Sequence, residues 1–461
     1  MKIGNIPFLI VFLSSLFPLL GALLNVPAYH LPAGSVAVAV ILILITQKKI
    51  AVRKNILTML VAPMSFIIFI MQLIIGHGFV ILSTGGYVLI FMLVFFTFFS
   101  MGTGSSLISM VRGISYLYKF FLITMLIEAV LIMLDLQPRL VAIFPGYKNY
   151  NSADILRYFG LMQDAGGLNS VLLGSQIAGM LALFSAIWFW GIRTFKDQGL
   201  AVGHSGFWIV LSLLVYLITV NGTNFLLLLL AGGIYVFLVN KKHRVKLLCG
   251  FMALIIGVYL AIDKHIILNR VFNKDLVHLQ PSDLEIYERY GILDQVQDLT
   301  TFEYYIYEFY SPVKRWLVED WVNELFGVGA QFFLDDLYYV AGDFGIGIGM
   351  LSAGALWIAM FSCAVIYSCI SALTKVEAGS NERQLWSKLG AINAMITLLW
   401  LASTVHYNQA FANPGGMTLF ALHFAVTVYS RYRYWQYKLR DNQARIFERS
   451  PERHCPTVVT L

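Results

Sequence analysis

Charged residues are scarce in this 461-residue chain. Asp, Glu, Lys and Arg make up 12% of it, whereas hydrophobic residues make up 59%. An average soluble domain carries about a quarter charged residues, and a chain so poor in charge cannot cover a soluble surface with polar groups. The composition therefore predicts a membrane protein, and no soluble domain is expected.

Cysteines and internal repeats are also few. Cys249, Cys363, Cys369 and Cys455 fall in apolar runs or in the C-terminal tail, so no disulfide is expected to link segments outside the membrane. No period of about 20 to 50 residues indicates a repeat array. The first apolar run lacks a convincing cleavage site, and it is therefore predicted to remain as an uncleaved helix.

Long apolar runs, by contrast, recur along almost the whole chain. A hydrocarbon core about 30 Å thick is crossed by roughly 20 helical residues, and backbone groups in lipid must be satisfied within a helix. The runs predict an all-α, polytopic membrane helix bundle of about 12 transmembrane helices. They lie at 6–25, 31–46, 56–76, 79–100, 117–134, 168–190, 206–220, 224–239, 247–262, 345–371, 386–404 and 416–430.

The distribution of Lys and Arg predicts the orientation, because positive charge is retained on the cytoplasmic side during insertion. With the N-terminus inside, 23 of the 32 Lys and Arg residues fall in inward segments, and nine fall in two periplasmic loops, 135–167 and 263–344. We predict a single transmembrane domain, 1–430, and a basic cytoplasmic tail, 431–461, with both termini cytoplasmic. Topology and anionic lipid heads then account for the net charge of +7, and no nucleic-acid partner is expected.

The second periplasmic loop is predicted to form a large helical cap over one face of the bundle. It is acidic, with fifteen Asp and Glu residues against six Lys and Arg. Apolar residues between 317 and 326 recur at three- and four-residue spacing, and polar residues such as Asp320 and Glu324 occupy the opposite face. This pattern predicts an amphipathic helix lying on the outer membrane surface, ended by Gly327 and Gly329.

Three arginines of the periplasmic loops are candidates for phosphate binding. A guanidinium keeps its charge and can hold phosphate oxygens through two parallel hydrogen bonds, each contributing about 1.5 to 3 kcal/mol. Arg157 and Arg270 lie near span ends, where the head of a lipid-linked substrate would lie, and Arg315 precedes the amphipathic helix. The alternative for each arginine is contact with lipid headgroups.

Two further positions are candidates for proton transfer. Asp335 and Asp336 stand before the span at 345–371, and repulsion together with partial burial would disfavour ionisation of one carboxyl, so the pair is a candidate proton acceptor. Capping of a helix that begins at Leu337 is the alternative. His406 follows another span and can titrate near neutral pH, or it serves only as a hydrogen-bonding group.

Three stretches carry a resemblance to a known group of proteins: "RYFGLMQDAGGLNSVLLG", "LNRVF" and "KRWLVEDWVNELFGVGAQFFLDDLYYVAGDFGIGIGML". Together with the many spans, they resemble the O-antigen ligase and Wzy-type polysaccharide polymerase superfamily, which are GT-C-like integral membrane glycosyltransferases. In that group an Arg-containing helix leads to a Gly-x-Gly turn, a polar pair, a Tyr and a Gly-rich helix start. The matching positions here are Arg315, Gly327 to Gly329, Asp335 and Asp336, Tyr338, and Gly345 to Gly349.

The resemblance implies a glycosyltransferase in the bacterial inner membrane that works at the periplasmic face without metal or cofactor. It would polymerise repeat units carried on undecaprenyl pyrophosphate into O-antigen, capsule or exopolysaccharide. Membrane lipids, a flippase and a chain-length regulator are the further partners implied. By resemblance, Arg157, Arg270 and Arg315 would neutralise the leaving pyrophosphate, and Asp335 or Asp336 would accept the proton from the acceptor hydroxyl. Substrate binding is assigned to Asp164, Arg289, Tyr338 and His406.

Three alternatives remain at this stage. An O-antigen ligase would transfer finished glycan to the lipid A core, but such ligases present a histidine where Asp335 stands, which favours the polymerase. A flippase for lipid-linked oligosaccharide would place charges at mid-membrane, and the only such residues we find deep in predicted spans are Glu128 and His423. A structural scaffold would retain polymer production without its outward arginines.

Overall fold

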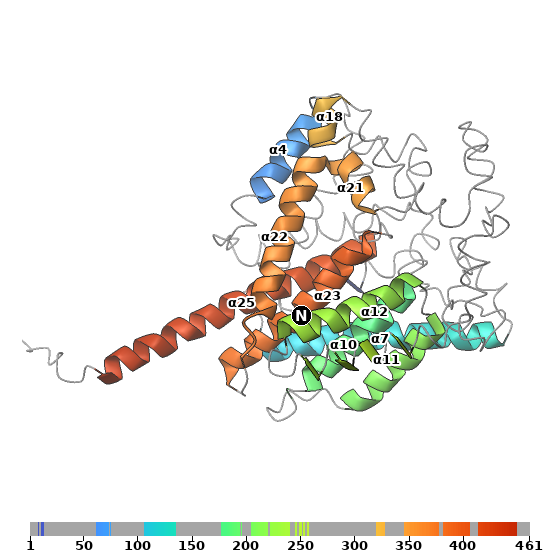
Figure 1. The fold of residues 1–461 in the computed structure, drawn as a ribbon, viewed down its shortest axis with the longest axis vertical. Coiled ribbons are helices and arrows are strands. Elements are labelled where there is room, and N and C mark those ends of the chain that lie inside the picture. Colours follow the sequence, from blue (N-terminus) through green and yellow to red (C-terminus); the bar gives the residue numbers. More distant parts are fainter. Residues whose placement is uncertain are drawn as a thin grey trace, which may run out of the picture.

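The computed structural model of the chain is helical throughout the part it describes, with no strand among those residues. The described residues are 8, 11–12, 61–72, 74, 106–134, 177–193, 195, 204–219, 222–239, 245–246, 249–250, 252–253, 256–257, 320–327, 345–377, 381–405 and 414–449. Figure 1 shows the helices that they form. These are α4 (Ala62–Gln72), α7 (Leu107–Met133), α10 (Ile177–Arg193), α11 (Ser205–Thr219), α12 (Gly222–Ile234), η5 (Tyr235–Val239), α18 (Trp321–Phe326), α21 (Gly345–Ala353), α22 (Ala355–Leu373), α23 (Glu382–Ser403) and α25 (Pro414–Arg449).

Three of these helices are long and apolar enough to cross a membrane: Leu107–Leu131 of α7, Ala355–Leu373 and Glu382–Ser403. Some helices also leave large apolar side chains uncovered. On α11, Phe207 and Val210 are 60% and 58% exposed. Apolar surface of this kind is unfavourable in water and favourable in lipid, so the exposed faces agree with the composition.

Most predicted spans that fall in the described part of the chain correspond to helices. The spans predicted at 56–76, 168–190, 206–220, 224–239 and 386–404 overlap α4, α10, α11, α12 with η5, and α23. Those at 31–46 and 79–100 lie outside the described residues, and those at 6–25 and 247–262 are described at only a few positions. The total of twelve spans, the periplasmic cap and the orientation remain predictions.

Helix α7 begins at Leu107, ten residues before the span predicted at 117–134. The residues between them include the charged Arg112. A helix needs only continuous backbone hydrogen bonds, and Met110 already donates its N–H to the carbonyl of Ser106. The polar residues are therefore part of the helix rather than of a preceding loop.

The span predicted at 345–371 is interrupted at one residue, Gly354, which separates α21 from α22. Its backbone has φ 82° and ψ 153°, a region that only glycine occupies without strain. A Cβ on Gly354 would collide with the backbone carbonyl of Leu325 at the end of α18. The break therefore allows α18 to approach the backbone of the neighbouring helices.

Helix α25 is longer than predicted. The sequence indicates a span at 416–430 followed by a tail, but the helix runs without interruption from Pro414 to Arg449. Its 36 residues correspond to about 54 Å, whereas the hydrocarbon core is about 30 Å thick. The first part of the predicted tail is thus a helical extension of α25, and in Figure 1 its end projects from the rest of the described helices.

Close packing joins α23 to α25 and α10 to α11. A Cβ added at Gly390 of α23 would lie 3.2 Å from the Cβ of Ser430 on α25, and Gly191 of α10 faces Ile392 of α23 in the same way. Small residues at such crossings let helix backbones approach closely in membranes. Trp188, Trp386 and Trp400 are fully buried in the core that these helices enclose.

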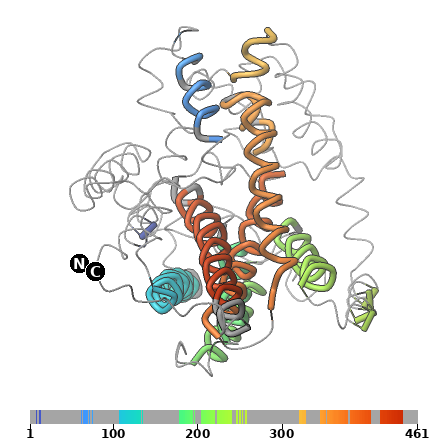
Figure 2. The backbone as a smooth tube through the Cα atoms, turned by 90° about the vertical axis from the view of Figure 1, so that its left-hand side faces the viewer, coloured from blue at the N-terminus to red at the C-terminus, as the bar shows by residue number. Residues whose placement is uncertain are grey.

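Helix α22 leaves this group at a steep angle and reaches α4, α18 and α21 at its other end, as Figures 1 and 2 show. Trp357 of α22 donates its Nε1–H to Ser65 Oγ of α4 over 2.8 Å. Phe361 stacks on Trp357 with ring centroids 4.7 Å apart. The described helices therefore form one body with two distinct ends along α22.

Candidate functional site

A chain of buried polar side chains links the middle of three helices. Tyr118 of α7, Asn393 of α23 and His423 of α25 are each at most 1% exposed. The Tyr118 hydroxyl lies 2.7 Å from His423 Nε2, and His423 Nδ1 lies 2.7 Å from Asn393 Oδ1. Polar groups buried in an apolar bundle require hydrogen-bonding partners. Here Tyr118 is a partner of His423, and His423 is a partner of Asn393.

The hydrogen bonds determine the tautomer of the imidazole. The Nδ2 amide of Asn393 donates to the carbonyl of Leu389 over 2.8 Å, so its Oδ1 faces His423 as an acceptor. His423 therefore carries its proton on Nδ1 and accepts at Nε2 from the Tyr118 hydroxyl. Three neutral groups are satisfied in this way without a charge in the core.

Aromatic packing holds the Tyr118 ring in place. The ring stacks on His423 with centroids 5.7 Å apart, and Trp188 of α10 lies on another side at 6.3 Å. Trp188 in turn donates its Nε1–H to Ser115 Oγ over 3.0 Å, one turn before Tyr118 on α7. Because the rings leave little freedom of rotation, the hydroxyl stays directed at the imidazole.

This arrangement can fix the register of the three helices, because each hydrogen bond joins side chains of two different helices. Ionisable side chains inside a membrane bundle are rare and are often functional. Glu128 is also buried on α7, ten residues and therefore about 15 Å beyond Tyr118. The sequence alone singles out His423 and Glu128 as ionisable residues within apolar runs. It does not single out Tyr118 and Asn393, which become partners of His423 only through the packing of the helices.

The residues to which the sequence assigns the chemistry belong to other segments. All nine lie outside the described residues, and their roles stay predictions: Arg157, Arg270, Arg315, Asp335, Asp336, Asp164, Arg289, Tyr338 and His406. The structure does describe the helices that bound three of the segments concerned. The positions of these helix ends show which segments adjoin the same part of the described structure.

Helix α18 comes directly before the segment with the acidic pair. It begins at Trp321 and not near Leu317, because Asp320 has an extended backbone and caps the helix. The Asp320 carboxylate accepts the N–H groups of Val322 and Asn323, both over 2.9 Å. The prediction that Asp320 lies on the polar face of the helix is therefore wrong: a carboxylate at this position satisfies free backbone donors and the helix dipole.

The predicted end of α18 is confirmed at Gly327, whose φ of 79° stops the helix. The two large apolar side chains Trp321 and Leu325 are 68% and 38% exposed. A tryptophan exposed in this way is typical of a membrane–water boundary. The location of α18 on the outer surface of the membrane remains a prediction.

Helices α18 and α21 pack against each other and against α22. Segment 328–344, which contains Asp335, Asp336 and Tyr338, therefore leaves and returns to the described body at one place. The N–H of Ile346 in α21 donates to the carbonyl of Thr404 at the end of α23 over 3.1 Å. His406 stands two residues after Thr404, so the boundaries of two predicted site segments meet at this hydrogen bond.

We name this region the glycine end: α18, α21, Gly354 and the C-terminus of α23 at Thr404. The described helices define the class of the protein as a helical membrane protein. No protein-family model matches the chain, and no curated protein or solved structure matches it. The assignment of a function therefore rests on the residues themselves.

Proposed function

We propose that the protein is a membrane glycosyltransferase that polymerises glycan repeat units carried on undecaprenyl pyrophosphate. The proposal is supported by the sequence resemblance over the two periplasmic loops. One structural observation supports it further, namely the hydrogen bond between Ile346 and Thr404. Ile346 follows the segment that carries Asp335 and Asp336, and Thr404 precedes the segment that carries His406. The bond therefore brings together the ends of two segments that are far apart in the sequence.

In the proposed reaction, a hydroxyl oxygen of the acceptor glycan attacks the anomeric carbon of the donor glycan. A new glycosidic bond forms while the bond from that carbon to the pyrophosphate oxygen breaks, and the electron pair leaves with the pyrophosphate. Arg157, Arg270 and Arg315 stabilise the charge that develops on this group. The hydroxyl proton passes to Asp335 or Asp336.

A turnover assay with the purified full-length protein in liposomes tests the proposal. The lipid-linked repeat unit is supplied, and the products are separated by length. We expect a ladder with the wild type, and its loss with Arg157→Ala and with Arg270→Ala at unchanged thermal stability. Arg440→Gln is a matched control, because Arg440 is an exposed arginine of the α25 extension. A full ladder from both alanine variants would refute the proposed role of the arginines and favour a scaffold.

Two further assays separate the alternatives. If lipid A core is added and a single transfer to it replaces the ladder, the protein is a ligase. Transport across the bilayer of a lipid-linked oligosaccharide, without any new glycosidic bond, would instead show a flippase. The flippase is the second candidate because His423 and Glu128 are both buried in the bundle, where transporters carry ionisable groups. In that case His423→Leu would abolish transport.

A further inference from the structure

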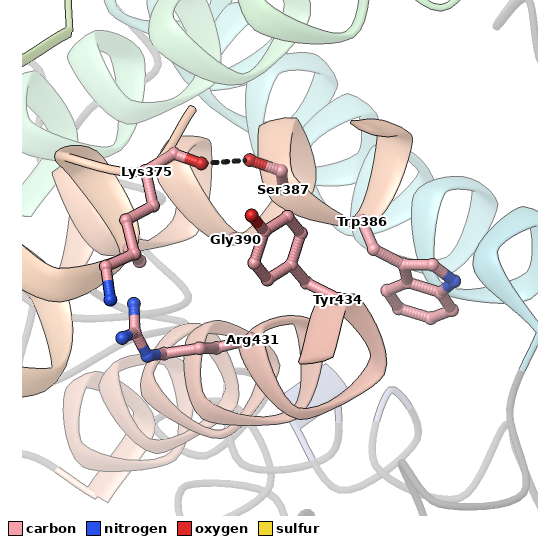
Figure 3. Close-up of a pocket in the computed structure, with 7 residues that line it drawn as sticks. Lys375, Trp386, Ser387, Gly390, Arg431 and Tyr434 are labelled. Carbon is pink, nitrogen blue, oxygen red and sulfur yellow. Dashed lines mark hydrogen bonds between the residues drawn. The ribbon is translucent and has the colours of Figure 1, made fainter. Parts of the chain in front are cut away.

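The opposite end of α22 carries a concentration of basic and aromatic residues. We name it the basic end: the turn 374–377, the start of α23, and residues 430–441 of α25. A pocket opens there between the three helices, as Figure 3 shows, and it has room for about one water molecule. It is lined by Ala372, Lys375, Trp386, Ser387, Gly390, Arg431 and Tyr434.

Two cations face each other at the mouth of this pocket. Figure 3 shows the Lys375 ammonium group directed toward the Arg431 guanidinium. Repulsion from Arg431, together with burial and repulsion from Lys438, lowers the pKa of Lys375 below its usual value. None of these three cations forms an ion pair with a carboxylate of the described residues.

The carboxylates nearby are already engaged with other groups. Glu377 lies 2.8 Å from Arg383 and accepts the hydroxyl of Tyr434 over 2.5 Å. Asp441 lies 3.0 Å from the same Arg383, and Glu382 lies 4.0 Å from Arg433. These carboxylates therefore pair with Arg383 and Arg433, and not with Lys375, Arg431 or Lys438.

An exposed tryptophan joins the two lysines. The Nζ atoms of Lys375 and Lys438 lie 5.1 Å and 5.0 Å from the centre of the Trp435 ring. Such distances allow cation–π attraction, and tryptophan is enriched at the height of lipid headgroups. Both ammonium groups therefore lie close to one ring at the surface of α25.

The backbone under the cations is fixed by Ser387. Its hydroxyl donates to the carbonyl of Lys375 over 2.8 Å and accepts the N–H of Glu377 over 3.3 Å. Arg431 also donates to the carbonyl of Ser371 near the end of α22, where a cation compensates the helix dipole. This hydrogen bond uses one arm of the guanidinium and leaves its other N–H groups for a ligand.

We propose that Lys375, Arg431 and Lys438 bind the phosphate of an anionic phospholipid headgroup. An anion placed between the three cations removes their mutual repulsion and accepts their hydrogen bonds. The pocket is too small for a headgroup, so the phosphate lies at its mouth.

A lipid is the expected source of the phosphate because an apolar face of α22 leads up to the site. Ile366, Tyr367 and Ile370 are exposed one to two turns before the end of the helix, where an acyl chain would cover them. This site is distant along α22 from the glycine end, and its test is independent of the proposed glycosyltransferase activity.

Quenching of tryptophan fluorescence by brominated lipids tests the site in bilayers of the neutral lipid phosphatidylcholine. The signal of Trp435 is the difference between the full-length wild type and Trp435→Phe. Brominated phosphatidylglycerol is expected to quench this signal more than brominated phosphatidylcholine at the same mole fraction. Lys375→Gln and Lys438→Gln should each weaken the apparent affinity for phosphatidylglycerol about fivefold. Arg431→Lys, which keeps the charge, should weaken it less than either.

Arg440→Gln is the matched control, because it removes one positive charge of the same helix outside the cluster. The proposal is overturned if Arg440→Gln weakens the affinity as much as Lys438→Gln does, since binding would then follow total charge alone. Inorganic phosphate distinguishes a soluble ligand from a lipid. When brominated phosphatidylglycerol quenches Trp435, added phosphate should recover no more of the Trp435 fluorescence than chloride does at the same ionic strength. A larger recovery with phosphate than with chloride would overturn the assignment to lipid.

Discussion

The glycine end and the basic end terminate the same helices but are held together by different means. At the glycine end, backbone meets backbone: the carbonyl of Leu325 lies against Gly354, and Ile346 donates to the carbonyl of Thr404. At the basic end, side chains make the connections, and Arg383 alone bridges Glu377 and Asp441. The two ends should therefore respond differently to substitution.

This difference has a consequence for function. Backbone contacts at a glycine tolerate no added atom, so the boundaries of segments 328–344 and 406–413 are held in one geometry. Exposed ion pairs, by contrast, contribute little to stability individually and are screened by salt. The glycine end is thus suited to fix the relative positions of the helix ends, whereas the basic end is suited to anchor the bundle to a charged surface.

The largest effect is expected from Gly354→Ala at the glycine end. The backbone region of Gly354 costs a residue with a Cβ about 1 to 3 kcal/mol, and the collision with Leu325 adds an overpacking cost of about 1 to 3 kcal/mol. Thermal unfolding of the purified protein in detergent should therefore begin at a clearly lower temperature.

Gly206→Ala provides the comparison for this variant, because an added Cβ at Gly206 meets nothing within 4 Å. This change lies in the first turn of α11, and alanine there should leave the melting temperature unchanged or raise it slightly. Equal melting temperatures for Gly354→Ala and Gly206→Ala would contradict the close contact between α18 and the break before α22.

A smaller effect is expected from Asn393→Leu, midway between the two ends. The change removes the acceptor of the His423 Nδ1–H group and leaves a buried donor without its partner, at a cost of about 1 to 3 kcal/mol. Ser185→Ala is the control, since Ser185 is equally buried but donates its hydroxyl to the carbonyl of Leu181 in its own helix. If Asn393→Leu and Ser185→Ala have the same melting temperature, the buried hydrogen bonds between helices do not stabilise the fold.

Long apolar runs predict most of the described helices, because an apolar run in lipid can form little else. They do not predict the break at Gly354, since a glycine within an apolar run is compatible with an uninterrupted helix. The extension of α25 from Arg431 to Arg449 is missed for the opposite reason. Its residues are too polar for a membrane span, although their helix propensity is adequate.

The candidate sites show where reasoning from sequence stops. His423 stands out in the sequence as a rare ionisable residue inside an apolar run, yet its partners Asn393 and Tyr118 are 30 and 305 positions away. Only the crossing of three helices brings them together. In the same way, the like-charged contact of Lys375 and Arg431 depends on how the turn before α23 packs on α25.

A still smaller effect is expected at the basic end from Arg383→Gln. The two ion pairs of Arg383 are partly exposed, so their loss should cost no more than about 1 kcal/mol. The difference from the wild type should shrink as salt is added, because screening weakens the pairs in the wild type. Melting curves at low and high ionic strength check this expectation, and a large, salt-independent loss would mean that Arg383 acts through packing.

The smallest effect concerns Tyr434, also at the basic end. Burial, followed by the hydrogen bond to Glu377, raises the pKa of Tyr434 to about 12, from about 10 in an unfolded chain. The folded state thus favours the protonated phenol, and this contribution to stability is complete below pH 10 and is lost as the pH rises toward 12. Because the Tyr434 hydroxyl donates to Glu377, the wild type should melt at a higher temperature than Tyr434→Phe at pH 8. This difference in melting temperature should narrow between pH 10 and 12 as the phenol ionises. A difference that stays constant over this range would show that folding does not raise the pKa of Tyr434.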